Sequence, residues 1–114
     1  MKGIKLPTTY KVLGQSNPSA TTATNLYTAP SSTSAVVSTL SVCNQAASAG
    51  TYRIAVRPAA EELAAKHYII YDATLPSKTT DTLTLGLTLA TTDVLTVYAS
   101  NANFAFGAFG TELT

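Results

Sequence analysis

Charged residues are scarce in this sequence. Seven Lys and Arg and six Asp and Glu make up 11% of its 114 residues, whereas an ordinary soluble domain has about 25%. The formal net charge is +1. A nucleic-acid-binding protein needs clustered Lys and Arg to neutralise phosphates, so we predict no nucleic-acid partner. The near balance of the two signs also excludes an acidic, solvating tail.

Other residues that define protein classes are equally rare. The chain has one Cys, one His and no Trp, and a single Cys excludes an internal disulfide framework. The first ten residues contain two Lys but lack the apolar stretch of a secretory signal. No stretch approaches the roughly 18 apolar residues of a membrane-spanning helix. We therefore expect a soluble, unprocessed chain with no membrane partner, made in a reducing cytosol.

The few reactive side chains do not combine into a site. His67 is the only imidazole base, and no G-x-S-x-G motif is present to orient a nucleophilic Ser. Cys43 follows an apolar Val, where a free Cys usually packs as a small buried hydrophobe. Glu61 and Glu62 are adjacent, so on a helical turn their carboxylates point in different directions. With no metal-ligand spacing either, we predict no catalytic, cofactor-binding or metal-binding residue and a structural role for His67.

Thr, Ser and Ala alternate with apolar residues along most of the chain. Hydrophobic residues make up 46% of it, and about 20 residues are Thr. An alternation with a period of two is the pattern of half-buried strands. It predicts about eight short strands near residues 10–13, 25–28, 36–42, 51–57, 67–71, 82–89, 94–99 and 104–109.

The clearest strand lies at residues 51–57. Its alternation places Tyr52, Ile54 and Val56 on one face and Arg53 and Arg57 on the other. Pro58 ends it.

Three other segments carry predictions about burial. Val36 is expected to share a face with the apolar residues at positions 40 and 42, and the four Leu between residues 83 and 89 to share another. The apolar run from His67 to Tyr71 is consistent with burial on both faces. Gly107 and Gly110 follow a strand pattern and are expected to permit a bulge or a close backbone approach.

This spacing of strands and turns is typical of an all-β fold. It indicates an antiparallel two-sheet sandwich, Ig-like or jelly-roll-like, or else a small barrel, and we predict the sandwich. Residues 59–66 favour at most one helical turn, and no room is left for the crossover helices of a parallel α/β fold. We expect a single domain at residues 10–110, a flexible N-terminal arm at 1–9 and a C-terminal tail at 111–114.

Two arginines and a Phe-rich segment are the candidate protein contacts. Arg53 and Arg57 are four apart in one strand and therefore share a face. That face is either simply solvated or in contact with a partner, because Arg is enriched at interface hot spots. The candidate contact residues, besides the two ends of the chain, are Arg53, Arg57, Phe104, Phe106 and Phe109.

The exposed Thr, Ser and Ala favour a packed subunit over a freely diffusing monomer. Short side chains lose little conformational entropy when they are ordered against a neighbour. A surface with few charges also lacks the repulsion that keeps proteins apart. We therefore expect a homo-oligomer or a subunit present in many copies.

Seven segments together resemble a known family: KVLGQ at 11–15, NLYTAP at 25–30, TYRIAVRP at 51–58, KHYI at 66–69 with Tyr71-Asp72, LTLGLTL at 83–89, Asp93-Val94, and FGAFG at 106–110. The family consists of small virion structural proteins of tailed bacteriophages, frequent in cyanophages and other marine phages. The resemblance covers nearly the whole chain, although Glu61 and Glu62 make one loop more acidic than is usual in that family. It implies a non-enzymatic component of the virion, made in the host cytoplasm, whose partners are phage coat or tail proteins.

Several positions in the particle fit this resemblance. The first expectation is a multi-copy capsid decoration (cement) protein that stabilises the head. A tail, baseplate or fibre-attachment component is the second. A glycan-binding adhesin module is a more remote alternative, because such modules use aromatic platforms and the chain has no Trp. An enzyme is the last of the functions that we expect.

Overall fold

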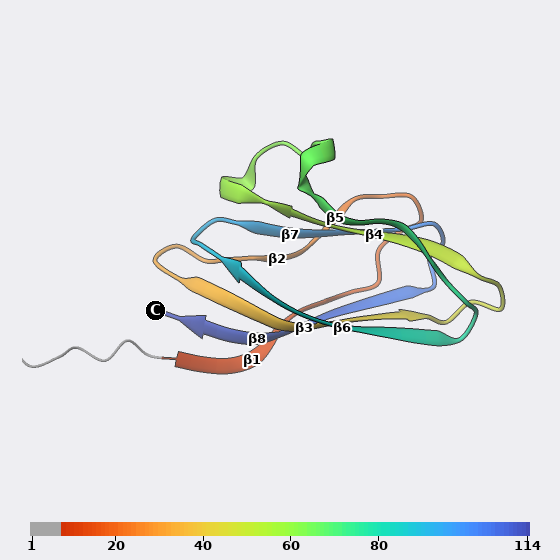
Figure 1. Cartoon of the computed structure of the whole chain (residues 1–114), viewed down its shortest axis with the longest axis horizontal. Helices are drawn as coiled ribbons and strands as arrows, with labels where there is room; N and C mark the ends of the chain where they lie inside the picture. The colour runs from red at the N-terminus through yellow and green to blue at the C-terminus, as the bar shows by residue number, and fades with distance from the viewer. Residues whose placement is uncertain (1–7) are drawn as a thin grey trace, which may run out of the picture.

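The computed structural model describes residues 8–114, which form eight strands in two four-stranded antiparallel sheets (Figure 1). The predicted all-β sandwich is confirmed. Two short 3-10 turns, η1 (Pro58–Ala60) and η2 (Ala65–His67), join the fourth strand to the fifth. The strands are β1 (Thr8–Ser16), β2 (Thr24–Thr28), β3 (Ser34–Asn44), β4 (Gly50–Arg57), β5 (Tyr68–Leu75), β6 (Thr79–Leu89), β7 (Val94–Ala99) and β8 (Phe104–Leu113).

The order of the strands is that of a jelly roll. The first sheet runs β1-β8-β3-β6 and the second runs β2-β7-β4-β5. β1 pairs with β8, β2 with β7, β3 with β6 and β4 with β5, so the pairs are nested as in one long hairpin rolled over on itself. An Ig-like sandwich would group its strands as ABED and CFG. Of the two sandwiches expected, the chain therefore adopts the jelly roll.

The core lies between the sheets and is aromatic at one end. The ring of Tyr52 lies 6.2 Å from that of Phe104 and 6.3 Å from that of Phe106. Such aromatic pairs contribute about 0.5–1.5 kcal/mol beyond the area that they bury. The inward face predicted for β4 is confirmed. Aliphatic residues fill the rest of the core, among them Val37, Leu40, Val42, Ile54, Leu95 and Val97.

Two tyrosine hydroxyls connect the sheets. Tyr52 on β4 donates a hydrogen bond to Asp81 on β6 (2.9 Å), and Tyr27 on β2 donates one to Glu112 on β8 (2.6 Å). Burial, reinforced by the carboxylate beside each hydroxyl, raises the pKa of both phenols above its usual value. The hydrogen bond from Tyr27 lowers the pKa of Glu112. Both carboxylates of the first sheet are therefore satisfied on its inner side.

Asn44 connects the end of β3 to the turn between β5 and β6. Its side chain is fully buried. Its Nδ2 donates to the carbonyl oxygens of Ser48 (3.0 Å), Leu75 (3.1 Å) and Pro76 (3.2 Å), and its Oδ1 accepts the N–H of Ala46 (3.0 Å). A buried amide with its hydrogen bonds made holds both sheets at the aromatic end of the core.

A bulge in β3 changes which side chains face the core. The register with β8 leaves Ser38 without a partner between Val37 and Thr39, so the alternation reverses there. Val37 is buried, and Val36 lies on the opposite face. The prediction that Val36 shares the core-facing side with residues 40 and 42 is therefore wrong.

β6 is bulged at the same level. Leu85 and Gly86 together lie opposite Ser38, and Gly86 adopts a positive φ of 64°. Leu85 is exposed, whereas the other three Leu of the repeat are partly or fully buried. The four Leu therefore do not share one face, because the bulge turns one of them to solvent.

β5 is an edge strand and is not buried on both faces. It ends the second sheet, and Tyr71 is 60% exposed. Its register with β4 shifts twice, and Asp72 has a positive φ of 54°. The apolar run predicted burial because hydrophobicity alone does not separate a central strand from an edge strand. His67, at the start of that run, lies in η2.

The domain is wider than residues 10–110. Thr8 pairs with Leu113, and Thr9 pairs with Glu112. The predicted C-terminal tail is therefore wrong for residues 111–113, which belong to β8. Of the predicted N-terminal arm, residues 1–7 lie outside the described residues, and the last two belong to β1.

Residues 58–67, which we call the 58–67 connection, lie over the second sheet (Figure 1). The single helical turn expected here is two 3-10 turns, since Ala59 and Ala60 both have a positive φ that interrupts a helix. Asp93 holds the connection in place: one carboxylate oxygen accepts the N–H of Ala59 and the other accepts that of Ala90, both at 2.8 Å.

Gly110 confirms the expected close approach of backbones and provides a test of the fold. A Cβ added there would overlap the carbonyl oxygen of Val36. At Gly107 an added Cβ would meet only the ends of two side chains, Ser41 at 2.9 Å and Phe109 at 3.0 Å, and side-chain ends can move. We expect Gly110→Ala to lower the free energy of unfolding by about 3 kcal/mol and Gly107→Ala by about 1 kcal/mol. Urea denaturation measures both, and equal losses would contradict the close approach at Gly110.

Candidate functional site

The outer face of the first sheet carries no charged side chain among residues 8–114. The four strands contain three charged residues, and all of them face the second sheet: Lys11 pairs with Glu112 at 3.3 Å, and Asp81 accepts the hydroxyl of Tyr52. We call this outer face the uncharged face. By register and burial it includes Tyr10, Val12, Gln15, Val36, Thr39, Ser41, Cys43, Thr80, Thr82, Thr84, Thr88, Ala105, Gly107, Phe109 and Thr111.

Phe109 lies at the centre of the uncharged face. Its ring lies over Gly107, which is buried beneath it beside the hydroxyl of Ser41. Cys43 is on the same face and is half-buried, so it is less enclosed than the sequence suggested. The residues next to this ring on β3 and β8, Thr39, Ser41 and Gly107, have small side chains or none.

Two of the three predicted Phe contacts are corrected by the structure. Phe104 is 0% exposed and Phe106 is 3% exposed, because both face the core. As folded they offer no surface to a partner. The alternation of β8 separates them from Phe109, which has the opposite parity and stays on the outer side.

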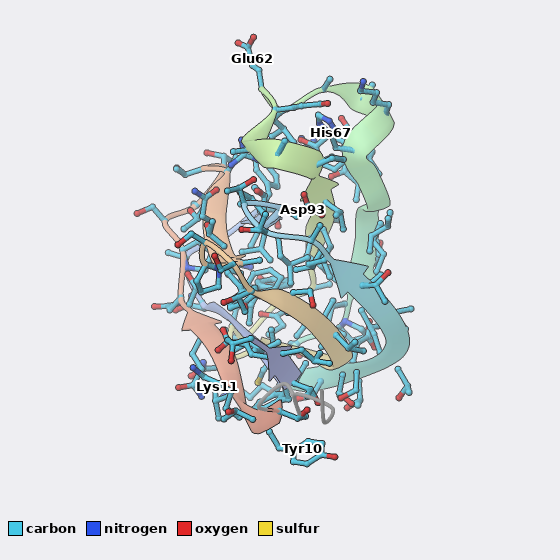
Figure 2. All side chains as sticks on the ribbon, turned by 90° about the vertical axis from the view of Figure 1, so that its left-hand side faces the viewer. Tyr10, Lys11, Glu62, His67 and Asp93 are labelled. Atoms are coloured by element: carbon cyan, nitrogen blue, oxygen red, sulfur yellow. The ribbon has the colours of Figure 1, made fainter. Side chains whose placement is uncertain are left out.

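The uncharged face ends at β1 with two exposed apolar side chains. Tyr10 is 84% exposed and Val12 is 50% exposed. In Figure 2 Tyr10 projects away from the rest of the molecule, on the side opposite the 58–67 connection, where Glu62 and His67 are seen. Large apolar groups exposed at a sheet edge are characteristic of interaction surfaces.

The outer face of the second sheet carries an arginine held between tyrosines. The guanidinium carbon of Arg53 lies 4.1 Å from the ring centre of Tyr71 and 4.2 Å from that of Tyr98. Its Nε and Nη2 donate to the two carboxylate oxygens of Asp72 at 2.6 and 3.2 Å. This hydrogen bonding lowers the pKa of Asp72. The charge of Arg53 is therefore compensated within the chain, in the stacked and bidentate geometry that suits Arg better than Lys.

Arg57 shares that face, as predicted, but its contacts are internal. Its guanidinium donates to the Thr96 hydroxyl (3.0 Å), the Asn25 side chain (2.9 Å) and the Glu61 carbonyl (2.8 Å). These three bonds join β2, β7 and the 58–67 connection. Each of its three guanidinium nitrogens makes one of these bonds, so the orientation of Arg57 is fixed by contacts within the chain.

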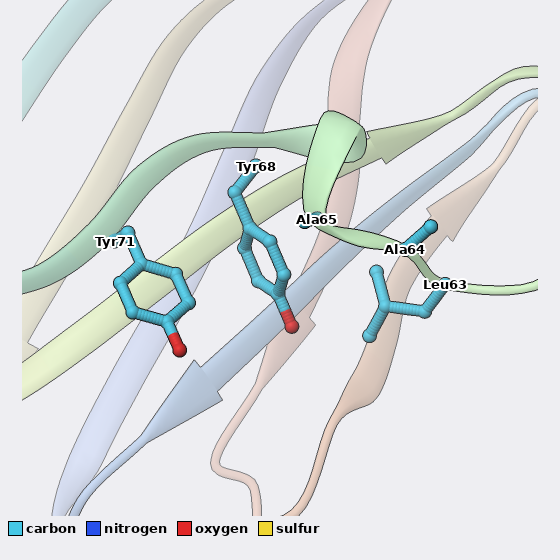
Figure 3. Close-up of a pocket in the computed structure, with 5 residues that line it drawn as sticks. All are labelled: Leu63, Ala64, Ala65, Tyr68 and Tyr71. Carbon is cyan, nitrogen blue, oxygen red and sulfur yellow. The ribbon is translucent and has the colours of Figure 1, made fainter.

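A hollow of about 630 Å³ lies between this cluster and the 58–67 connection. Tyr68 and Tyr71 meet edge to face, with ring centres 5.0 Å apart and planes at 84°. Figure 3 shows the two rings side by side, with Leu63 on the far side of Tyr68. The hollow is lined by Leu63, Ala64, Ala65, Tyr68 and Tyr71.

His67 is buried and both of its ring nitrogens are engaged. Nδ1 accepts the N–H of Ala64 (2.9 Å), which assigns the proton to Nε2, 3.1 Å from the carboxylate of Glu61. The hydrogen bond to His67, with Lys66 nearby, lowers the pKa of Glu61. This arrangement fits a structural role in closing the 58–67 connection.

The described part of the chain has no cluster of three or more His, Cys, Asp or Glu side chains that could hold a metal ion. In the same residues no helix has the length and apolar character to cross a membrane.

Sequence reasoning identified Arg53 but missed the groups around it. Tyr98 lies directly opposite Arg53 on β7, and Asp72 is brought to it by the positive φ at that residue. The only signal in the sequence was the number of Tyr residues, which is six. The uncharged face was also missed, because the register of the strands determines that the side chains of Asp81 and Glu112 point inward.

We expect the ion pair between Arg53 and Asp72 to be visible in acid titration. A carboxyl whose folded-state pKa is below its ordinary value of 3.8 contributes stability above pH 3.8, and this contribution is lost as the pH falls through the folded-state value. In Arg53→Gln the pKa of Asp72, measured by NMR of the side-chain carboxyl, returns toward 3.8. The pKa of Glu112, whose donor is Tyr27, stays low and is the internal control. An unchanged Asp72 pKa in the variant would refute this geometry.

No protein-family model matches the chain, and no curated protein matches it significantly. Its function is therefore inferred from the chemistry of its two outer faces.

Proposed function

We propose that this protein is a non-enzymatic structural subunit of a tailed-bacteriophage virion, present in many copies as a decoration (cement) protein on the head. Its partners are phage coat proteins and further copies of itself. The observation that carries the proposal is the uncharged face. The resemblance of the sequence to small virion structural proteins supports the same reading.

The uncharged face suits burial against protein. Removing a charge from water is costly unless it is paired, and none has to be removed here among the described residues. Thr, Ser, Ala and Gly lose little side-chain entropy when they are ordered, so most of the interaction energy remains available for binding. Phe109, Val12 and Tyr10 add apolar area at the centre and edge of the face.

The second sheet suits the opposite position, facing solvent. It and the 58–67 connection carry most of the charged residues of the described chain, among them Arg53, Arg57, Glu61, Glu62 and Asp72. Charges of both signs keep an outer surface soluble. A cement protein of this kind would bind across the boundaries between coat subunits and add contact area that opposes the pressure of packaged DNA.

The fold is compatible with this role but does not assign it. Jelly rolls occur in viral capsid domains and also in lectins and cupins. Because one fold serves many functions, the likeness is an analogy only.

A charge placed on the uncharged face should abolish binding to the particle. Thr82 is exposed on the edge strand β6 and lies opposite Ser41 in the register, so Thr82→Lys puts an ammonium on the uncharged face without disturbing the core. Thr74→Lys, on the exposed side of β5 in the second sheet, is the matched control. We expect Thr82→Lys to weaken binding to heads that lack the protein at least about a hundredfold, since a buried unpaired charge costs several kcal/mol, while Thr74→Lys binds normally.

Cryo-EM of the particle and quantitative gels measure the location and copy number. Hundreds of copies on the head lattice would support the cement role. Low copy number with three-, six- or twelvefold symmetry would replace it with the alternative, a tail, baseplate or fibre-attachment component. Normal binding by Thr82→Lys would show that the uncharged face is not the contact.

A glycan-binding adhesin module is the second candidate, and one observation favours it. The hollow beside Tyr71 presents two tyrosine rings and Leu63 to solvent, and aromatic rings can stack on sugar faces. On a glycan array, wild-type protein would then bind a sugar, and Tyr71→Ala would lose that binding. An array with no bound glycan removes this candidate.

A further inference from the structure

The two sheets leave four edge strands, and the register of each one shifts at least once. β2 has five residues and a register shift, the register of β5 shifts twice, and β6 is bulged at Leu85 and Gly86. Bulges of this kind prevent an edge from pairing with another chain. The straight part of β6, residues 79–84, turns only Thr side chains to the outer face.

The first half of β1 has no bulge or register shift that would prevent it from pairing with another chain. From Thr8 to Val12 each residue pairs in step with β8, and the register first shifts after Val12. All five residues are exposed, and Tyr10 and Val12 present large apolar groups beside the free edge. The single charge, Lys11, is already paired with Glu112 of the same chain. Such an edge offers unpaired backbone groups and apolar area to an extended strand.

We propose that residues 8–12 of β1 pair with the same residues of a second copy, antiparallel and about a twofold axis at Tyr10. A twofold contact must be self-complementary, and this strand meets that requirement. Tyr10 then lies opposite Tyr10 of the second copy, an aromatic cross-strand pair, and Thr8 lies opposite Val12. Lys11 lies opposite Thr9, so no like charges face one another. The residue that precedes this segment in the sequence, Pro7, has no N–H to donate.

This pairing would join two first sheets into one sheet of eight strands. The two uncharged faces become continuous across the twofold axis, with the tyrosines at the join. The use of that widened face for binding coat protein rests on the proposed function, whereas the pairing itself does not. Five paired residues bury less than the 1,200–2,000 Å² of a stable interface, so the isolated dimer should be weak and be strengthened when both copies are bound to one surface.

Engineered cysteines test the register in the purified full-length chain. With Cys43→Ser as background, Tyr10→Cys should form an intermolecular disulfide, because opposed Cα atoms of antiparallel strands lie about 4.5–5.5 Å apart. Val12→Cys alone should not, since the two residues at position 12 are four positions apart along the strand, about 13 Å. A mixture of Thr8→Cys and Val12→Cys should cross-link as a heterodimer. We expect the Tyr10→Cys and mixed reactions to be at least about tenfold faster than that of Val12→Cys alone.

Sedimentation provides a second measurement that needs no disulfide. Wild-type protein should show concentration-dependent dimerisation, and Tyr10→Lys should weaken it at least about tenfold, because two ammonium groups would face one another. Leu85→Lys, exposed at the bulge of the opposite edge strand, is the control and should leave the dimer intact.

A chain that stays monomeric at about 1 mM, or cysteines that cross-link equally at positions 10 and 12, would overturn the pairing. Neither result would bear on whether the uncharged face binds heads, which the Thr82→Lys experiment measures separately.

Discussion

Tyr52 joins the two sheets in two ways at once. Its ring packs with Phe104 and Phe106 at the aromatic end of the core, and its hydroxyl reaches Asp81 on the opposite sheet. An inward carboxylate without such a donor would be strongly destabilising. Because Tyr27 does the same for Glu112, and Glu112 in turn pairs with Lys11, the first sheet satisfies all its charges on its inner side. Among residues 8–114, the three charged side chains of the first sheet are therefore kept off its outer face by hydrogen bonds and an ion pair on the inner side.

Much of the fold could be predicted from the sequence, because a period of two is a direct consequence of strand geometry. That argument located the eight strands and the inward face of β4. It was wrong about Val36, because the extra residue Ser38 reverses the faces on its two sides in β3, and about Leu85, because the bulge in β6 turns that one side chain to solvent. It was also wrong about β5, since an apolar run has no signature that distinguishes the edge of a sheet from its middle. Nested pairing depends on contacts between distant residues, with Thr8 and Leu113 the farthest apart in the sequence, and no local pattern reports those contacts.

The candidate site was less accessible to sequence reasoning. Arg53 could be named from its position on a polar strand face, but its neighbours Tyr71, Tyr98 and Asp72 come from other strands and meet it only through register. Of the three Phe expected at a contact, two are in the core, and parity alone could have separated them from Phe109. The scarcity of charge was visible from the composition. The composition did not show that the charged residues avoid one face, because that requires knowing in which direction the side chains of Lys11, Asp81 and Glu112 point.

The nested order of the strands also determines when the first sheet can form during synthesis of the chain. β1 has β8 as its partner within the first sheet, so Thr8 waits for Leu113 to be synthesised before its backbone can be paired. Folds dominated by such distant pairings form slowly, since the entropy of closing a long loop must be overcome before any contact compensates for it. During synthesis, the same Tyr10 and Val12 stay exposed on an unpaired strand. The segment proposed to recognise a second copy is therefore also the strand of this domain that waits longest for its own partner during synthesis.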